Sequence, residues 1–104
     1  MKRLLLPLLA ALAFPTAVKA NFYDEQTFKR RWPIFVDEFS TGTKFQELED
    51  YEMMCERFVR ANNELKNYFT IFQKYQTNPD VDLFGIRAQL KTIVKACGEQ
   101  YSIY

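Results

Sequence analysis

Two cysteines, Cys55 and Cys97, carry the most distinctive chemistry in this 104-residue chain. They lie too far apart in the sequence to form the C-x-x-C pair of a redox or zinc site. An even number of cysteines in a short exported protein favours a disulfide instead. A bridge that closes this loop of 42 residues would stabilise a small domain by about 4 kcal/mol. The alternative is two separate buried thiols.

Catalytic chemistry has few candidate residues. The chain contains no histidine, so the commonest general base and zinc ligand is missing, together with every Ser-His or Cys-His pair. Neither Ser40 nor Ser102 lies in a nucleophile motif, and the three glycines are too dispersed for a phosphate-binding loop. We therefore expect a protein that is not an enzyme and holds no cofactor or metal.

The densest group of carboxylates is Glu47, Glu49, Asp50, Glu52 and Glu56. On a helix, Glu49, Glu52 and Glu56 would come close together, as a site with paired acids requires. Acidic residues near a helix N-terminus are also favoured by the helix dipole without any further role. We favour this second interpretation, a solvated acidic face.

A run of cations flanked by aromatic residues consists of Phe28, Lys29, Arg30, Arg31 and Trp32, here called the basic–aromatic segment. Aromatic rings beside cations are typical of contacts at a membrane interface. In the alternative, Trp32 packs inward and the cations form an ordinary surface patch. We favour this alternative and keep the segment as the candidate for a partner or interface contact.

Residues 1–20 have the three parts of a cleavable secretory signal. Lys2 and Arg3 precede an apolar stretch at 4–18, and Val-Lys-Ala at 18–20 suits a signal peptidase. This stretch of 15 residues is shorter than the roughly 20 that cross a bilayer as a helix. An uncleaved membrane anchor is the alternative. We expect export to a periplasm, a thylakoid lumen or the extracellular medium.

Cleavage after residue 20 would leave one domain at 21–104. That domain keeps 11 of the 14 basic residues and all 13 acidic ones, a net side-chain charge of −2. Such a balance gives no general attraction to nucleic acid or anionic lipid. We expect a protein partner, with peripheral membrane contact as an option and no membrane span after cleavage.

Apolar residues at three- and four-residue steps predict a long helix at about 44–76. Thr43 and Gln46 match a capping box at its start, and Pro79 follows its end. Its apolar stripe consists of Leu48, Tyr51, Cys55, Phe58, Leu65, Phe69 and Phe72.

The same spacing predicts a second helix at about 80–98, capped by Asp80 and ended by Gly98. A short loop between the two helices implies an antiparallel hairpin. In that hairpin Cys97 would lie roughly 6–8 Å along the axis from Cys55. A disulfide then requires an inclined crossing or a longer loop.

Residues 21–43 keep a looser helical spacing of aromatic residues, and we expect this arm to fold over the hairpin and complete its core. Pro33 should kink the arm or begin a second short helix. Residues 40–43 are predicted to be a loop. The chain is therefore predicted to be all-α: a small helical domain built on an antiparallel helical hairpin, with an N-terminal amphipathic arm and one disulfide.

The sequences around both cysteines resemble the HdeA/HdeB family of small periplasmic acid-stress chaperones. Cys-Glu-Arg-Phe-Val at 55–59 is similar to that family's first cysteine, which is followed by an acidic residue and a Phe-aliphatic pair. Ile-Val-Lys-Ala-Cys at 93–97 is similar to its second cysteine, at the end of an apolar helix. The leader separately resembles those of small uncharacterised exported proteins from marine cyanobacteria.

The family resemblance implies a chaperone that acid activates. Protonation of the 13 carboxylates near pH 4 and below would change the side-chain charge of residues 21–104 from −2 to about +11. The resulting self-repulsion could loosen the domain and expose its aromatic residues.

We therefore expect a small exported, non-catalytic binding module that could act as a chaperone. The second hypothesis is an accessory subunit docked on a membrane-associated complex through the Trp32 region. The third is an enzyme that uses the Glu49, Glu52 and Glu56 cluster.

Overall fold

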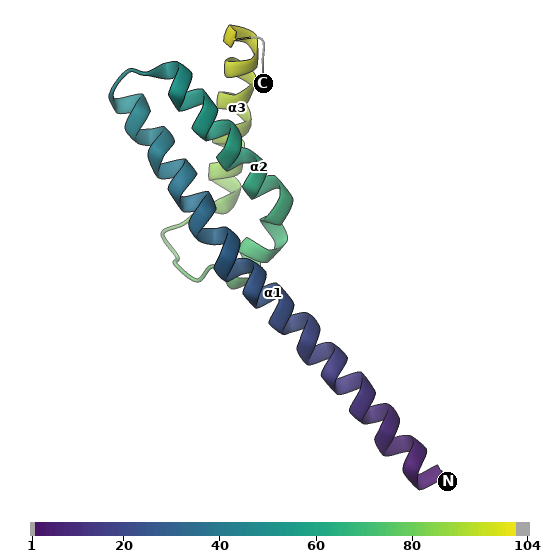
Figure 1. The fold of residues 1–104 in the computed structure, drawn as a ribbon. Helices are drawn as coiled ribbons and strands as arrows, with labels where there is room; N and C mark the ends of the chain where they lie inside the picture. The colour runs from purple at the N-terminus through teal and green to yellow at the C-terminus, as the bar shows by residue number, and fades with distance from the viewer. Residues whose placement is uncertain (1, 102–104) are drawn as a thin grey trace.

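The computed structural model describes the backbone of residues 2–101 and the side chains of residues 22–101. Helix α1 covers Lys2–Glu47, α2 covers Tyr51–Tyr75 and α3 covers Leu83–Tyr101. Figure 1 shows α1 and α2 running antiparallel on either side of a tight turn, with α3 returning behind them after a longer loop. The predicted all-α class and helical hairpin are confirmed.

The predicted signal peptide, residues 1–20, lies outside the residues whose side chains the structure describes, and its cleavage stays a prediction. Within the described residues, no helix combines the length and the apolar character needed to cross a bilayer. All side-chain contacts reported below belong to the domain at 22–101.

The predicted arm is not a separate element, because α1 continues through Pro33. The expected kink or second short helix at this proline is therefore wrong. Pro33 is exposed, and so is Lys29, whose carbonyl loses its helical partner to the proline ring. Water can satisfy that carbonyl, while aromatic side chains on the opposite face hold α1 against α2.

The predicted loop at 40–43 is also wrong, because these residues belong to α1. Thr43 does not cap a helix: its Oγ1 donates a hydrogen bond to the carbonyl of Phe39, 3.0 Å away, inside α1. Gly42 is buried, and a Cβ at this position would lie 2.7 Å from ring carbons of Phe58. Close packing of α1 on α2 thus overrides the low helix propensity of glycine and threonine.

The chain turns at residues 48–50 and not near residue 44. Glu49 adopts a left-handed conformation with φ of 59°. Asp50 is the N-cap of α2, and its side chain accepts a hydrogen bond from the backbone N–H of Met53 at 3.3 Å. The sequence predicted Thr43 as this cap, and the structure uses Asp50 instead, so that residues 40–47 extend α1 along α2.

Helix α3 begins and ends about three residues later than predicted. Its first turn is capped by Asp82, whose Oδ1 accepts the backbone N–H of Gly85 at 3.1 Å, while Asp80 lies in the preceding loop. Gly98 does not end the helix, and no described glycine has a positive φ. The apolar stripe continues for another turn to Tyr101, which is half-buried.

The predicted disulfide between Cys55 and Cys97 is confirmed. The two sulfurs lie 2.10 Å apart and the two α-carbons 5.8 Å apart, and both residues are buried. Two features remove the offset along the helix axes that would separate Cys55 from Cys97 in a regular hairpin. The backbone of α2 leaves helical geometry at Tyr68 (φ −123°, ψ 21°), and residues 76–82 form a longer loop than the sequence predicts.

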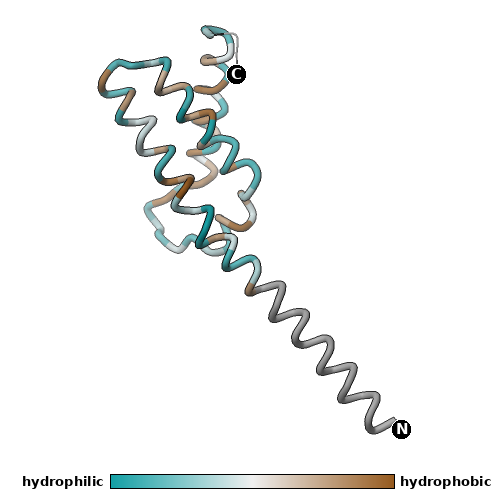
Figure 2. Tube along the Cα trace, viewed as in Figure 1, coloured by the Kyte–Doolittle hydropathy of each residue, from teal (hydrophilic) through white to brown (hydrophobic). Residues whose placement is uncertain are grey.

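The core is centred on Phe72 of α2, which is fully buried. Trp32, Phe35 and Phe28 of α1 approach it with ring centroids 5.2, 5.7 and 6.2 Å away. From α3, Leu83 and Leu90 complete the same cluster. The expectation that residues 21–43 complete the core is confirmed, and Figure 2 shows apolar and polar residues interspersed along the coloured part of α1 and along α2 and α3.

Replacing both cysteines, as Cys55→Ala/Cys97→Ala, should lower the free energy of unfolding by about 4 kcal/mol, because the unfolded chain regains its loop freedom. Urea unfolding followed by circular dichroism measures this loss. Reduction of the unmutated protein with dithiothreitol is the matched control and should give a similar loss. A variant within 0.5 kcal/mol of the oxidised protein would show that the bridge contributes little.

Candidate binding groove

Two adjoining hollows lie along α3. The disulfide hollow has a volume of about 470 Å³ and is lined by Tyr51, Met54, Cys55, Ile93, Ala96, Cys97, Gln100 and Tyr101. The α1–α3 hollow has a volume of about 490 Å³ and is lined by Phe39, Thr43, Gln46, Phe58, Ala88, Gln89, Thr92 and Ile93. Because Ile93 lines both hollows, we describe them together as the groove.

The disulfide hollow lies between α2 and α3, whereas the α1–α3 hollow exists because α1 and α3 both pack on α2 without a close approach of their backbones. In the described part of the chain, no α-carbon of α1 lies within 8 Å of an α-carbon of α3. Phe58 of α2, which is almost fully buried, lies between them and forms the floor. The walls come from the last turns of α1 on one side and from Ala88 onward in α3 on the other.

The lining of the groove is uncharged, although charged residues make up 26% of the chain. Its polar members are hydroxyl and amide side chains: Thr43, Gln46, Gln89, Thr92, Gln100 and the two tyrosines. Such a surface can bury an apolar ligand and donate or accept hydrogen bonds at its edge. It has no group that could act as a general acid or base near neutral pH.

One end of the groove has an exposed apolar edge at the α1–α2 turn. Leu48 and Tyr51, which begin the predicted apolar stripe of the long helix, are 65% and 51% exposed. Leu48 lies in the turn before α2, and Tyr51 is the first residue of α2. Because Tyr51 lines the disulfide hollow, its exposed ring extends the apolar surface of that hollow outward.

The predicted carboxylate cluster surrounds this edge and lines neither hollow. Glu47, Glu49, Asp50 and Glu52 are exposed. Glu56 accepts a hydrogen bond from Arg60 Nη2 at 2.6 Å. The geometry thus supports the interpretation as a solvated acidic face. It does not support a catalytic site with paired acids, because these carboxylates line neither hollow. Among the described residues, no three His, Cys, Asp or Glu side chains lie close enough together to hold a metal ion.

The basic–aromatic segment is divided between the core and the surface. Phe28 and Trp32 stack on each other with centroids 5.6 Å apart and pack against the buried core. Lys29 and Arg30 face solvent, and Arg31 donates to Glu64 Oε1 of α2 at 3.4 Å. The structure therefore favours the inward-packed alternative, since the ring proposed for an interface contact is held by α2.

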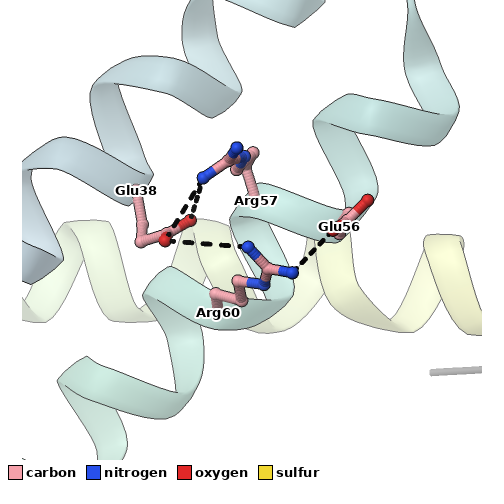
Figure 3. Close-up of polar contacts among 4 residues, drawn as sticks. All are labelled: Glu38, Glu56, Arg57 and Arg60. Carbon is pink, nitrogen blue, oxygen red and sulfur yellow. Dashed lines mark hydrogen bonds and ion pairs between the residues drawn. The ribbon is translucent and has the colours of Figure 1, made fainter.

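A second polar contact joins α1 to α2 (Figure 3). Arg57 Nη1 lies 3.4 Å from both carboxylate oxygens of Glu38, and Arg60 Nη1 lies 4.0 Å from the same carboxylate. The Glu38 side chain is only 13% exposed. None of Glu38, Arg57 and Arg60 lines either hollow, so these ion pairs are not part of the groove.

Comparison with family models, curated proteins and solved structures finds no match to this chain. The assignment of function therefore rests on the groove and on the sequence itself.

Sequence reasoning missed the groove, although it located both cysteines that lie in it. The residues on its α3 wall give one available signal: Gln89, Thr92, Ala96 and Gln100 form an uncharged face of α3 beside its buried stripe. A helix face made of small and uncharged polar residues is unusual for a fully solvated surface. The α1 wall could not be predicted, because residues 40–43 were expected to be a loop.

Glu38→Gln should lower the free energy of unfolding by about 1–3 kcal/mol, because it leaves the half-buried guanidinium of Arg57 without a charged partner. Urea unfolding at pH 7 measures the change. Glu25→Gln removes an equal charge from the exposed Glu25–Lys29 pair (3.5 Å) and is the matched control, with a loss below about 0.5 kcal/mol. Equal losses in both variants would contradict a structural role for the Glu38 contact.

Proposed function

We propose that this protein is a small exported, non-catalytic module that binds other proteins through the groove. The observation that supports this most is the uncharged groove beside the disulfide, with Leu48 and Tyr51 exposed at its end. Exposed apolar side chains next to a concave apolar surface are typical of a binding site. Binding is favoured over catalysis because no carboxylate or cation lines the concave surface.

Export is part of the proposal and is supported by two independent features. The leader at 1–20 has the charge, length and cleavage site of a secretory signal. The disulfide joins two buried cysteines, and such bridges persist mainly in oxidising compartments outside the cytosol.

A chaperone-like form of this activity is supported by how the helices are held together. The disulfide ties α3 to α2 covalently, whereas α1 is held to α2 by packing and by the carboxylates of Glu38 and Glu64. Acid would add positive charge to the domain as a whole, and the resulting self-repulsion would act on the α1–α2 interface, which no disulfide holds. The aromatic stripe of α1 could then open while α2 and α3 remain joined.

Ala96→Glu should weaken protein binding, because it places a carboxylate on the exposed wall of the groove, where an apolar partner would have to desolvate it. The assay is suppression of the aggregation of isolated insulin B chain by light scattering, with the reductant removed beforehand so that the Cys55–Cys97 bridge stays intact. In this assay the variant should need roughly tenfold more protein. Gln73→Glu adds the same charge at an exposed site outside the groove and should behave like the unmutated protein. Unchanged activity in the Ala96 variant would remove the groove from the proposal.

Acidification should increase the fluorescence of an apolar dye bound to the protein below about pH 4. Helical circular dichroism should be largely retained, and return to pH 7 should reverse the change. The chaperone-like form predicts that insulin is held better at pH 3 than at pH 7. Dye fluorescence that stays flat down to about pH 2 would exclude this form and leave the binding module in place.

A further inference from the structure

The arrangement of the helices leaves one packing position unfilled. In a four-helix bundle each helix packs against two neighbours. Here α2 has α1 on one side and α3 on the other, while α1 and α3 are separated by the groove over Phe58. The α1–α3 hollow therefore has the two walls of the site that a fourth helix would occupy, and the disulfide hollow continues it along α2 and α3.

The groove is long enough for such a helix. Its α3 wall extends from Ala88 to Tyr101, a length of about 20 Å at 1.5 Å per residue, which corresponds to a helix of about 14 residues. Apolar side chains lie along the whole length: Phe39 and Phe58 at one end, Ile93 in the middle, and Met54 with the disulfide at the other end. A helix that binds here needs one apolar stripe and a polar outer face.

The charges around the groove indicate the sign of the partner's polar residues. Glu47, Glu49, Asp50 and Glu52 are all exposed beside the Leu48–Tyr51 edge. The dipole of α2 explains a carboxylate at Asp50 or Glu52. It does not explain Glu47, which lies at the C-terminal end of α1, where a negative charge is unfavourable. These carboxylates would attract Lys and Arg residues of a partner.

We propose that the groove binds a cationic amphipathic α-helix of a partner protein, which completes a four-helix bundle with its basic residues over the α1–α2 turn. This inference rests on the proposed function and adds the class of partner. Apolar contact with the groove supplies the binding energy, and the acidic turn selects the charge and direction of the helix.

The test uses the exported chain purified from its host and two fluorescein-labelled amphipathic helical peptides of about 14 residues. Both peptides have the same leucine stripe, but one has lysine and the other glutamate at every polar position. Fluorescence anisotropy should give a dissociation constant for the lysine peptide that is at least roughly tenfold lower. Ala96→Glu should weaken its binding roughly tenfold, and Gln73→Glu should leave it unchanged.

The charge contribution has its own pair of variants. Glu47→Gln/Glu49→Gln should weaken binding of the lysine peptide roughly fivefold at low salt, with a smaller effect at high salt. Asp24→Asn/Glu25→Gln removes the same charge from a part of α1 that is far from the α1–α2 turn. This variant should have little effect on binding of the lysine peptide. Equal weakening by both double variants would contradict a role for the acidic turn.

Three results would overturn the proposal. Failure of both peptides to bind, while Ala96→Glu still weakens the holding of insulin, would reject a helical partner and leave the proposed function intact. A dimer in sedimentation that Ala96→Glu abolishes would assign the groove to a second copy of this chain. Binding to anionic lipid vesicles that Ala96→Glu abolishes, without binding of the lysine peptide, would assign it to a membrane surface.

Discussion

The structure depends on the packing of both neighbouring helices on α2. Phe72 and Phe58 receive the aromatic stripe of α1, and Cys55 joins α3 covalently to the same helix. Because one helix carries both interfaces, its neighbours are held at the separation that its side chains set. The groove between α1 and α3 is a direct consequence of this arrangement.

The two interfaces of α2 differ in their chemistry. The contact with α3 combines apolar packing with a bond that only reduction can break. The contact with α1 combines a large aromatic surface with two half-buried ion pairs, Arg31–Glu64 and Glu38–Arg57, both of which require ionised carboxylates. Conditions that weaken ion pairs should therefore weaken the contact of α1 with α2 before they weaken the contact of α3 with α2.

The residues that form ion pairs, the exposed carboxylates and the apolar groove lie in different parts of the surface. The residues of the Arg57–Glu38–Arg60 cluster line neither hollow of the groove, and four exposed carboxylates lie at the α1–α2 turn. Ion pairs that stabilise the fold thus do not compete with the surface proposed for binding. The basic–aromatic segment, which the sequence singled out as a contact surface, contributes mainly to the core and to the α1–α2 interface.

Three features follow from the sequence: the helical class, the pairing of Cys55 with Cys97, and the inward face of α3. The helices and their faces can be predicted because residue spacing is a local property of the sequence. The pairing can be predicted because two cysteines allow only one bridge within the chain. The positions of the helix ends do not follow from the sequence. Thr43 and Asp50 are both adequate caps, and Pro33 and Gly42 both favour a break, so local preference left the choice open. Packing of α1 on Phe58 and Phe72 decided it, since burial of a whole aromatic stripe outweighs the cost of one proline and one glycine in a helix. The same packing kept α1 apart from α3, and only the tertiary structure could therefore reveal the groove.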